Sequence, residues 1–85
     1  MTPSVLIIDD SLTVRMDLAE LFAQEGFAVR HVASAAAGRD AFAAAPSDLI
    51  ILDVVLPDAD GVELLRDLRA SEHGRRAIVI MLSSE

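Results

Sequence analysis

The chain contains no cysteine, which excludes disulfide bonds, a thiol nucleophile and any zinc site built on thiolates. Two histidines, His31 and His73, are too few for most zinc sites. A chain without cysteine is compatible with a reducing compartment, and we expect a cytoplasmic protein.

Long apolar runs are also absent. The longest, Val5–Ile8, Leu49–Leu52 and Ala77–Leu82, are far shorter than the roughly 20 residues that cross a bilayer. No basic segment precedes the first run, and Asp9 and Asp10 end it at once, so we expect no signal peptide. Membrane is therefore not an expected partner.

Positive charge is scarce. The chain has 7 arginine and lysine residues against 14 aspartates and glutamates, and its formal net charge is −7 at pH 7. A field of this sign repels the phosphate backbone, so we expect no direct binding of nucleic acid. Cations and basic partners are favoured.

What is present is typical of one packed domain. The 85 residues are 53% hydrophobic and 25% charged, which suits a globular chain with a single core. This length excludes a large enzyme with separate cofactor and substrate domains.

Four short apolar segments predict strands. Val5–Ile8 is an uninterrupted run that ends in two aspartates, and Leu49–Leu52 repeats the pattern before one more. Such runs are typical of strands buried on both faces. Phe27–Val32 contains an arginine and a histidine and suggests an edge strand, and Ala77–Leu82 is the fourth run.

The segments between these predicted strands have apolar residues at helical spacing and are predicted to be helices. The first helix is predicted to begin after a capping Ser11 and to end at Gly26. The second, Ala35–Ala45, follows another serine and is closed by proline. The third runs from Val62 to a stop near Gly74.

Strands that alternate with helices predict an α/β fold, a parallel sheet covered by helices on both faces. In such sheets ligands bind outside the carboxyl ends of the strands. Asp9, Asp10, Asp53 and Ser83 all fall at those ends, so we expect them to meet in one pocket.

Three carboxylates that lie close together repel one another, so they must bind a cation, take up a proton or move apart. Two of them about 4 Å apart repel by roughly 4 kcal/mol at an effective dielectric constant near 20. A hard divalent ion is the simplest remedy, and Mg²⁺ prefers oxygen ligands from carboxylates, water and phosphate. A carboxylate beside such an ion can also act as a nucleophile toward phosphorus, with a hydroxyl bonding a phosphoryl oxygen.

Three motifs in this order resemble those of the receiver domain of two-component response regulators. The resemblance implies a flavodoxin-like (CheY-like) doubly wound fold. The motifs are Val5–Ser11, then Leu49–Asp53 followed by Leu56-Pro57 and Asp60-Gly61, and finally Ile80–Ser83.

The resemblance also implies a role for each matching residue. Asp53 matches the phosphoacceptor, which takes a phosphoryl group from a histidine kinase or a phosphotransfer protein. Asp10 matches a direct Mg²⁺ ligand and Asp9 a ligand largely through water, while the backbone carbonyl of Val55 completes the protein's share. Ser83 matches the switch hydroxyl. The implied catalysis is at most autocatalytic phosphotransfer to the chain's own aspartate.

Receiver domains normally continue with a helix, a lysine-bearing strand and a final helix, which have no counterpart here. We therefore expect residues 1–85 to be a receiver domain that is incomplete at its C-terminus. The alternative function is a non-catalytic, receiver-like interaction module that lacks the phosphoryl-binding lysine. We also expect self-association through the exposed fourth strand, Ala77–Leu82.

Asp58, Asp60 and Gly61 also resemble the nucleophile motif of haloacid-dehalogenase-type phosphatases. That motif directly follows a strand, whereas Pro57 intervenes here. The simpler prediction is a polar loop in which Asp60 and Gly61 start the third helix.

Overall fold

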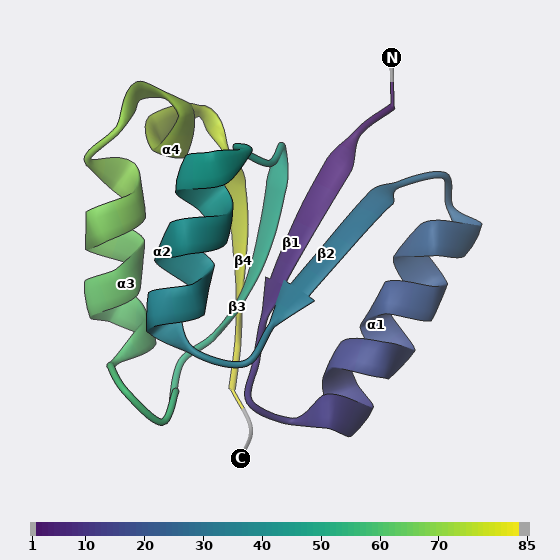
Figure 1. The fold of residues 1–85 in the computed structure, drawn as a ribbon, viewed down its shortest axis with the longest axis horizontal. Helices are drawn as coiled ribbons and strands as arrows, with labels where there is room; N and C mark the ends of the chain where they lie inside the picture. Colours follow the sequence, from purple (N-terminus) through teal and green to yellow (C-terminus); the bar gives the residue numbers. More distant parts are fainter. Residues whose placement is uncertain (1, 84–85) are drawn as a thin grey trace.

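The computed structural model describes residues 2–83, which form four strands and four helices (Figure 1). The strands are β1 (Ser4–Ile8), β2 (Ala28–Val32), β3 (Leu49–Asp53) and β4 (Ile78–Leu82). The helices are α1 (Leu12–Gln24), α2 (Ala35–Ala44), α3 (Gly61–Arg69) and α4 (Glu72–Arg76). None of these helices is both long enough and apolar enough to span a membrane. All strand pairs are parallel, which confirms the predicted α/β fold.

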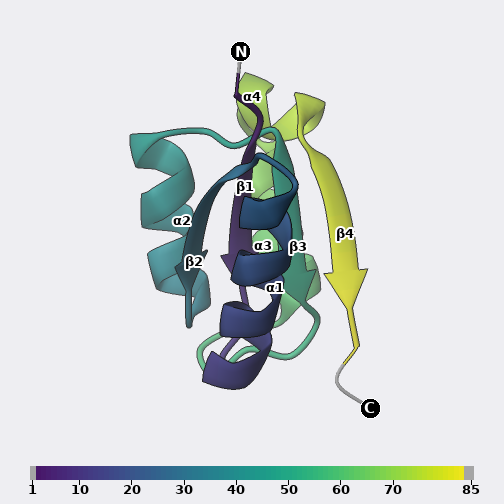
Figure 2. The ribbon, with the colours of Figure 1, turned by 90° about the vertical axis from the view of Figure 1, so that its right-hand side faces the viewer.

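Helices cover both faces of the sheet. Helix α1 lies against one face, and α2 and α3 lie against the other (Figure 2). Because alternate strand residues point to opposite faces, β1 supplies both cores. Leu6 and Ile8 join the core beneath α2 and α3, and Val5 and Ile7 join the core beneath α1. All four side chains are fully buried.

The strand order is β2-β1-β3-β4, so β2 and β4 are the edges of the described sheet. The edge position predicted for β2 is confirmed. Phe27 and Ala77, predicted as first strand residues, lie just outside β2 and β4. On the face that α1 covers, β4 stands clear of the helix (Figure 2), and Ile78 and Ile80 are 67% and 45% exposed.

The signals predicted at the starts of α1 and α2 and at the end of α1 are confirmed. Ser11 and Ser34 precede α1 and α2, and each hydroxyl accepts a hydrogen bond from the amide three residues later. These bonds satisfy amides that the first turn of a helix leaves without partners. Gly26, predicted as the stop after α1, has a φ of +90°.

The prediction that Gly74 ends the third helix was wrong. Helix α3 stops at Arg69, and Gly74 lies within the separate α4. A Cβ at Gly74 would lie 1.5 Å from the carbonyl oxygen of Leu68, so glycine is required by the close approach of two backbones. Arg69 stabilises the junction between α3 and α4, because its Nη1 donates to the carbonyl oxygens of Gly74 at 2.6 Å and Ala77 at 2.7 Å.

Candidate functional site

The order of the strands creates a crevice between β1 and β3. The chain leaves β1 for β2 on one side and later returns to β3 on the other, and α1 and α2 cross opposite faces. In parallel sheets this reversal opens a site at the carboxyl ends of the two strands. Asp9 and Asp10 follow β1, and Asp53 is the last residue of β3.

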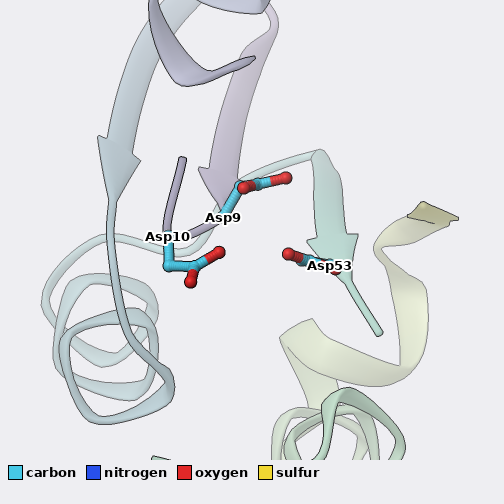
Figure 3. A group of neighbouring side chains, drawn as sticks. All are labelled: Asp9, Asp10 and Asp53. Atoms are coloured by element: carbon cyan, nitrogen blue, oxygen red, sulfur yellow. The ribbon is translucent and has the colours of Figure 1, made fainter. Parts of the chain in front are cut away.

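The three predicted acids meet in this crevice. Carboxylate oxygens of Asp9, Asp10 and Asp53 all lie within 4.8 Å of one another. Figure 3 shows the three side chains gathered around one space, two from the end of β1 and one from β3. Asp9 and Asp53 are only 6% and 2% exposed, whereas Asp10 faces solvent.

Main-chain amides hold the two buried carboxylates. Oδ1 of Asp9 accepts from the amide of Ser11 at 2.8 Å, and Oδ1 of Asp53 accepts from the amide of Val55 at 3.1 Å. Each bond closes a short turn directly after a strand, so the carboxylate is fixed by the backbone that carries it. The second oxygen of each carboxylate is left for another ligand.

The environment of Asp53 raises its pKa above the ordinary value of 3.8. Burial is the largest cause, because it disfavours the charged carboxylate. The negative charges of Asp9 and Asp10 raise the pKa further, while hydrogen bonds from the amides of Val55 and Val54 lower it. A cation in the crevice would reverse the balance by favouring the ionised form.

The donor set fits a hard divalent cation. The three clustered groups offer carboxylate oxygens, which Mg²⁺ prefers over nitrogen and sulfur ligands. An exposed Asp10 leaves one side of the crevice open to water or to a phosphate oxygen. The residues present therefore suit an ion that keeps part of its coordination shell for a substrate.

Ser83 and Val55 lie at this end of the sheet as well. A cavity of about 310 Å³ contains the three acids, and Ser83 follows β4 on its wall. Val55 is 66% exposed, and its amide is already bonded to Asp53. Ser84 and Glu85 lie outside the described residues. A larger hollow, about 420 Å³, lies by Asp48 at the amino ends of β3 and β4.

Two contacts that sequence reasoning missed hold the loop between β3 and α3. The carboxylate of Asp58 accepts from the amides of Ala35 at 2.8 Å and Ala36 at 3.0 Å, and so caps α2 from a distant loop. Gly61 packs so closely that a Cβ there would lie 2.3 Å from the carbonyl oxygen of Asp53. Asp60 caps α3, as predicted.

The model of the response regulator receiver domain family matches residues 5–85. The chain belongs to this family. Accepting a phosphoryl group is general for receiver domains, as is binding Mg²⁺ at an acidic pocket. In the receiver domain described here, Asp9, Asp10 and Asp53 form an acidic cluster.

Similar proteins agree with this assignment. Sporulation initiation phosphotransferase F of Bacillus subtilis is 29% identical over 85 residues, which are 100% of this chain and 68% of that protein. Transcriptional regulatory protein GltR of Pseudomonas aeruginosa is 37% identical over 81 residues, 95% of this chain but 34% of that protein. Chemotaxis response regulator CheY4 of Vibrio cholerae matches with a TM-score of 0.95 at 26% identity, covering 100% of this chain and 71% of that one.

Proposed function

We propose that this receiver domain takes a phosphoryl group onto Asp53 from the phosphohistidine of a histidine kinase or a phosphotransfer protein. The observation that carries the proposal is the convergence of Asp9, Asp10 and Asp53 within 4.8 Å at the carboxyl ends of β1 and β3. A free oxygen of Asp53 attacks phosphorus, the phosphorus–nitrogen bond of the donor breaks, and an aspartyl phosphate forms.

Mg²⁺ is the cofactor that we propose for this transfer. The carboxylates of Asp9, Asp10 and Asp53 and the backbone carbonyl of Val55 would hold it. Once bound, it supplies positive charge that offsets the charge on the phosphoryl oxygens. Asp9 and Asp10 keep the ion beside the nucleophile, and the amide of Val55 orients the Asp53 carboxylate.

Ser83 is the switch residue in this proposal. It lines the same cavity as Asp53, and its hydroxyl can donate a hydrogen bond to a phosphoryl oxygen. The added charge would draw Ser83 and its loop toward Asp53 and bias the surface around β4.

The proposed phosphodonor docks over the crevice. Two apolar side chains near it are strongly exposed: Leu12 by 60% and Val55 by 66%. Leu12 and Val55 follow pocket residues directly or closely in the chain, so an apolar partner surface reaching them would place its phosphohistidine over Asp53.

The decisive experiment incubates the chain with Mg²⁺ and acetyl phosphate and measures its intact mass. We expect one phosphoryl increment, which disappears in Asp53→Ala and persists in the control Asp40→Ala, an exposed acid on α2. No increment in the unaltered chain, or one that survives in Asp53→Ala, would refute the proposal.

A second candidate function is a non-catalytic interaction module that self-associates through β4. The exposed Ile78 and Ile80 on an edge strand favour it, because such edges pair with other strands. Light scattering should then detect dimers that Ile78→Lys disperses. The control Val62→Lys, which alters an exposed residue of α3, should leave dimers intact. A monomer at every concentration would count against this function.

A further inference from the structure

Arg15 links the acidic cluster to the edge strand β2. It lies on the second turn of α1, and its Nη1 donates to the carbonyl oxygen of Asp9 at 2.8 Å. Its Nε donates to Nδ1 of His31 at 3.2 Å. His31 is a residue of β2 that pairs with Ile7 of β1. One guanidinium therefore joins the end of β1 to the neighbouring strand.

The bond to Asp9 acts on the peptide group that leads to Asp10. The amide of Asp9 donates to the carbonyl of Val32 at 3.1 Å, and its carboxylate accepts from the amide of Ser11. With Arg15 on the carbonyl, Asp9 is held at three points. Within residues 2–83 the Asp10 side chain makes no hydrogen bond, so its direction depends on the backbone that these contacts fix.

Among the described residues, Arg15 orients its hydrogen-bond partners and does not form an ion pair with an acid. The ion pairs in the described part of the chain join Arg39 to Asp67 and Arg76 to Glu72, and Arg15 takes part in neither. Its donors meet a carbonyl oxygen and a ring nitrogen instead. We propose that Arg15 is a positioning residue, which holds the turn from Asp9 to Ser11 in the shape that binds a divalent cation. This inference rests on the proposed function.

Charge and position predict opposite effects of removing Arg15, which makes the test sharp. Loss of a positive charge beside a cation site, acting alone, would strengthen Mg²⁺ binding. Loss of a contact that orients the ligands should weaken binding, typically by tenfold or more. We expect Arg15→Met to weaken Mg²⁺ affinity about tenfold in a calorimetric titration. The control Arg39→Met removes an exposed arginine that does not contact the acidic cluster and should leave affinity nearly unchanged.

Two further variants separate positioning from folding. Arg15→Lys keeps the charge but cannot hold both partners, so its affinity should fall between those of the unaltered chain and Arg15→Met. His31→Ala removes only the outer contact and should weaken binding about threefold. If Arg15→Met does not fold, His31→Ala provides the test in its place. Mg²⁺ binding by Arg15→Met that is equal to or tighter than that of the unaltered chain would overturn the proposal. If Arg15→Met does not fold, the same result in His31→Ala would overturn it.

A metal-free measurement distinguishes failure of this inference from failure of the proposed function. The Ser11 amide is bonded to the Asp9 carboxylate, so its hydrogen exchange reports the order of the turn. We expect exchange at Ser11 to be about tenfold faster in Arg15→Met without Mg²⁺. Unchanged exchange refutes positioning by Arg15. A chain that binds no Mg²⁺ refutes the metal in the proposed function, while the Ser11 readout still decides the role of Arg15.

Discussion

At Asp53, burial, two neighbouring acids and two amide donors act on the same carboxylate. Asp53 is 2% exposed, so burial disfavours its charged form, and the charges of Asp9 and Asp10 add repulsion. The amides of Val54 and Val55 offset only part of this cost, because the pKa remains raised. Such a placement is unfavourable for folding alone, which is typical of residues kept for chemistry.

Replacing Asp53 should therefore stabilise the chain when no metal is present. The raised pKa means that the folded state binds more protons than the unfolded state just above 3.8, and stability falls as pH rises through that interval. Asp53→Asn removes this loss and keeps an oxygen for the Val55 amide. We expect a gain on the order of 1 kcal/mol at neutral pH in a urea titration with chelator.

The gain should vanish below pH 3.8, where Asp53 is protonated in both states. Asp40→Asn, which alters an exposed acid on α2, serves as the control and should change stability little at either pH. A less stable Asp53→Asn in neutral, metal-free buffer would show that repulsion in the cluster is not the dominant effect.

Val55 should make the phosphorylated state long-lived. Its side chain is exposed beside Asp53 and cannot hydrogen-bond a water molecule that attacks the aspartyl phosphate. Val55→Asn adds a group that can orient such a water, so we expect the phosphoryl lifetime to shorten several-fold, in keeping with the effect of one positioned group. Val55→Ala should leave it almost unchanged. Faster loss in Val55→Ala but not in Val55→Asn, followed by intact mass, would contradict this mechanism.

Among the elements, the loop between β3 and α3 is held by hydrogen bonds from a distant helix. Asp58 in this loop accepts from the first two amides of α2, and Gly61, the first residue of α3, donates to the carbonyl oxygen of Val54 at 2.7 Å. The middle of the loop is thus bonded to α2, and the start of α3 is bonded to the residue directly after β3. These contacts keep the backbone around Val55 in place, where it orients Asp53.

The contact between Asp58 and α2 should appear as pH-dependent stability. Hydrogen bonds from the amides of Ala36 and Ala35 hold the pKa of Asp58 below its ordinary value of 3.8. Its contribution is therefore present above 3.8 and is lost as pH falls through the lower, folded value. We expect Asp58→Ala to unfold at lower urea concentration at neutral pH.

The difference between Asp58→Ala and the unaltered chain should shrink in strong acid, because protonation then weakens the same cap in the unaltered chain. Asp17→Ala is the matched control, since Asp17 is an exposed acid of α1. A destabilisation of Asp58→Ala that is equally large at both pH values would argue for lost packing rather than for a charged cap.

For the molecule as a whole, a divalent cation should couple to folding. The net charge of −7 already favours cations, and the unfolded chain does not hold Asp9, Asp10 and Asp53 together. Mg²⁺ at 100 times its dissociation constant should stabilise the folded state by about 2.7 kcal/mol, which raises the midpoint of thermal unfolding.

Asp10→Asn should lose most of this Mg²⁺-dependent shift, whereas Asp40→Asn should keep it. Sodium chloride at matched ionic strength controls for general screening of the negative charge. An equal shift in sodium chloride, or one that persists in Asp10→Asn, would mean that the cation acts on overall charge and not at the cluster.

The sequence by itself determined the strands, the parallel sheet and the meeting of the acids. Apolar runs, helical spacing and capping serines are local signals, and short connections leave few ways to arrange alternating strands and helices. In a parallel sheet, the residues that follow the strands all lie at the same end of the sheet. Asp9, Asp10 and Asp53 could therefore be placed together without coordinates.

Only the tertiary structure decided the individual contacts that side chains and backbone groups make in the packed domain. The separate α4 depends on how closely Gly74 approaches Leu68, and the cap of α2 comes from Asp58, 23 residues away from Ala35. The contact of Arg15 with His31 and the raised pKa of Asp53 likewise depend on side-chain placement and burial in the folded chain. Local patterns do not encode such distances, because packing of the whole domain sets them.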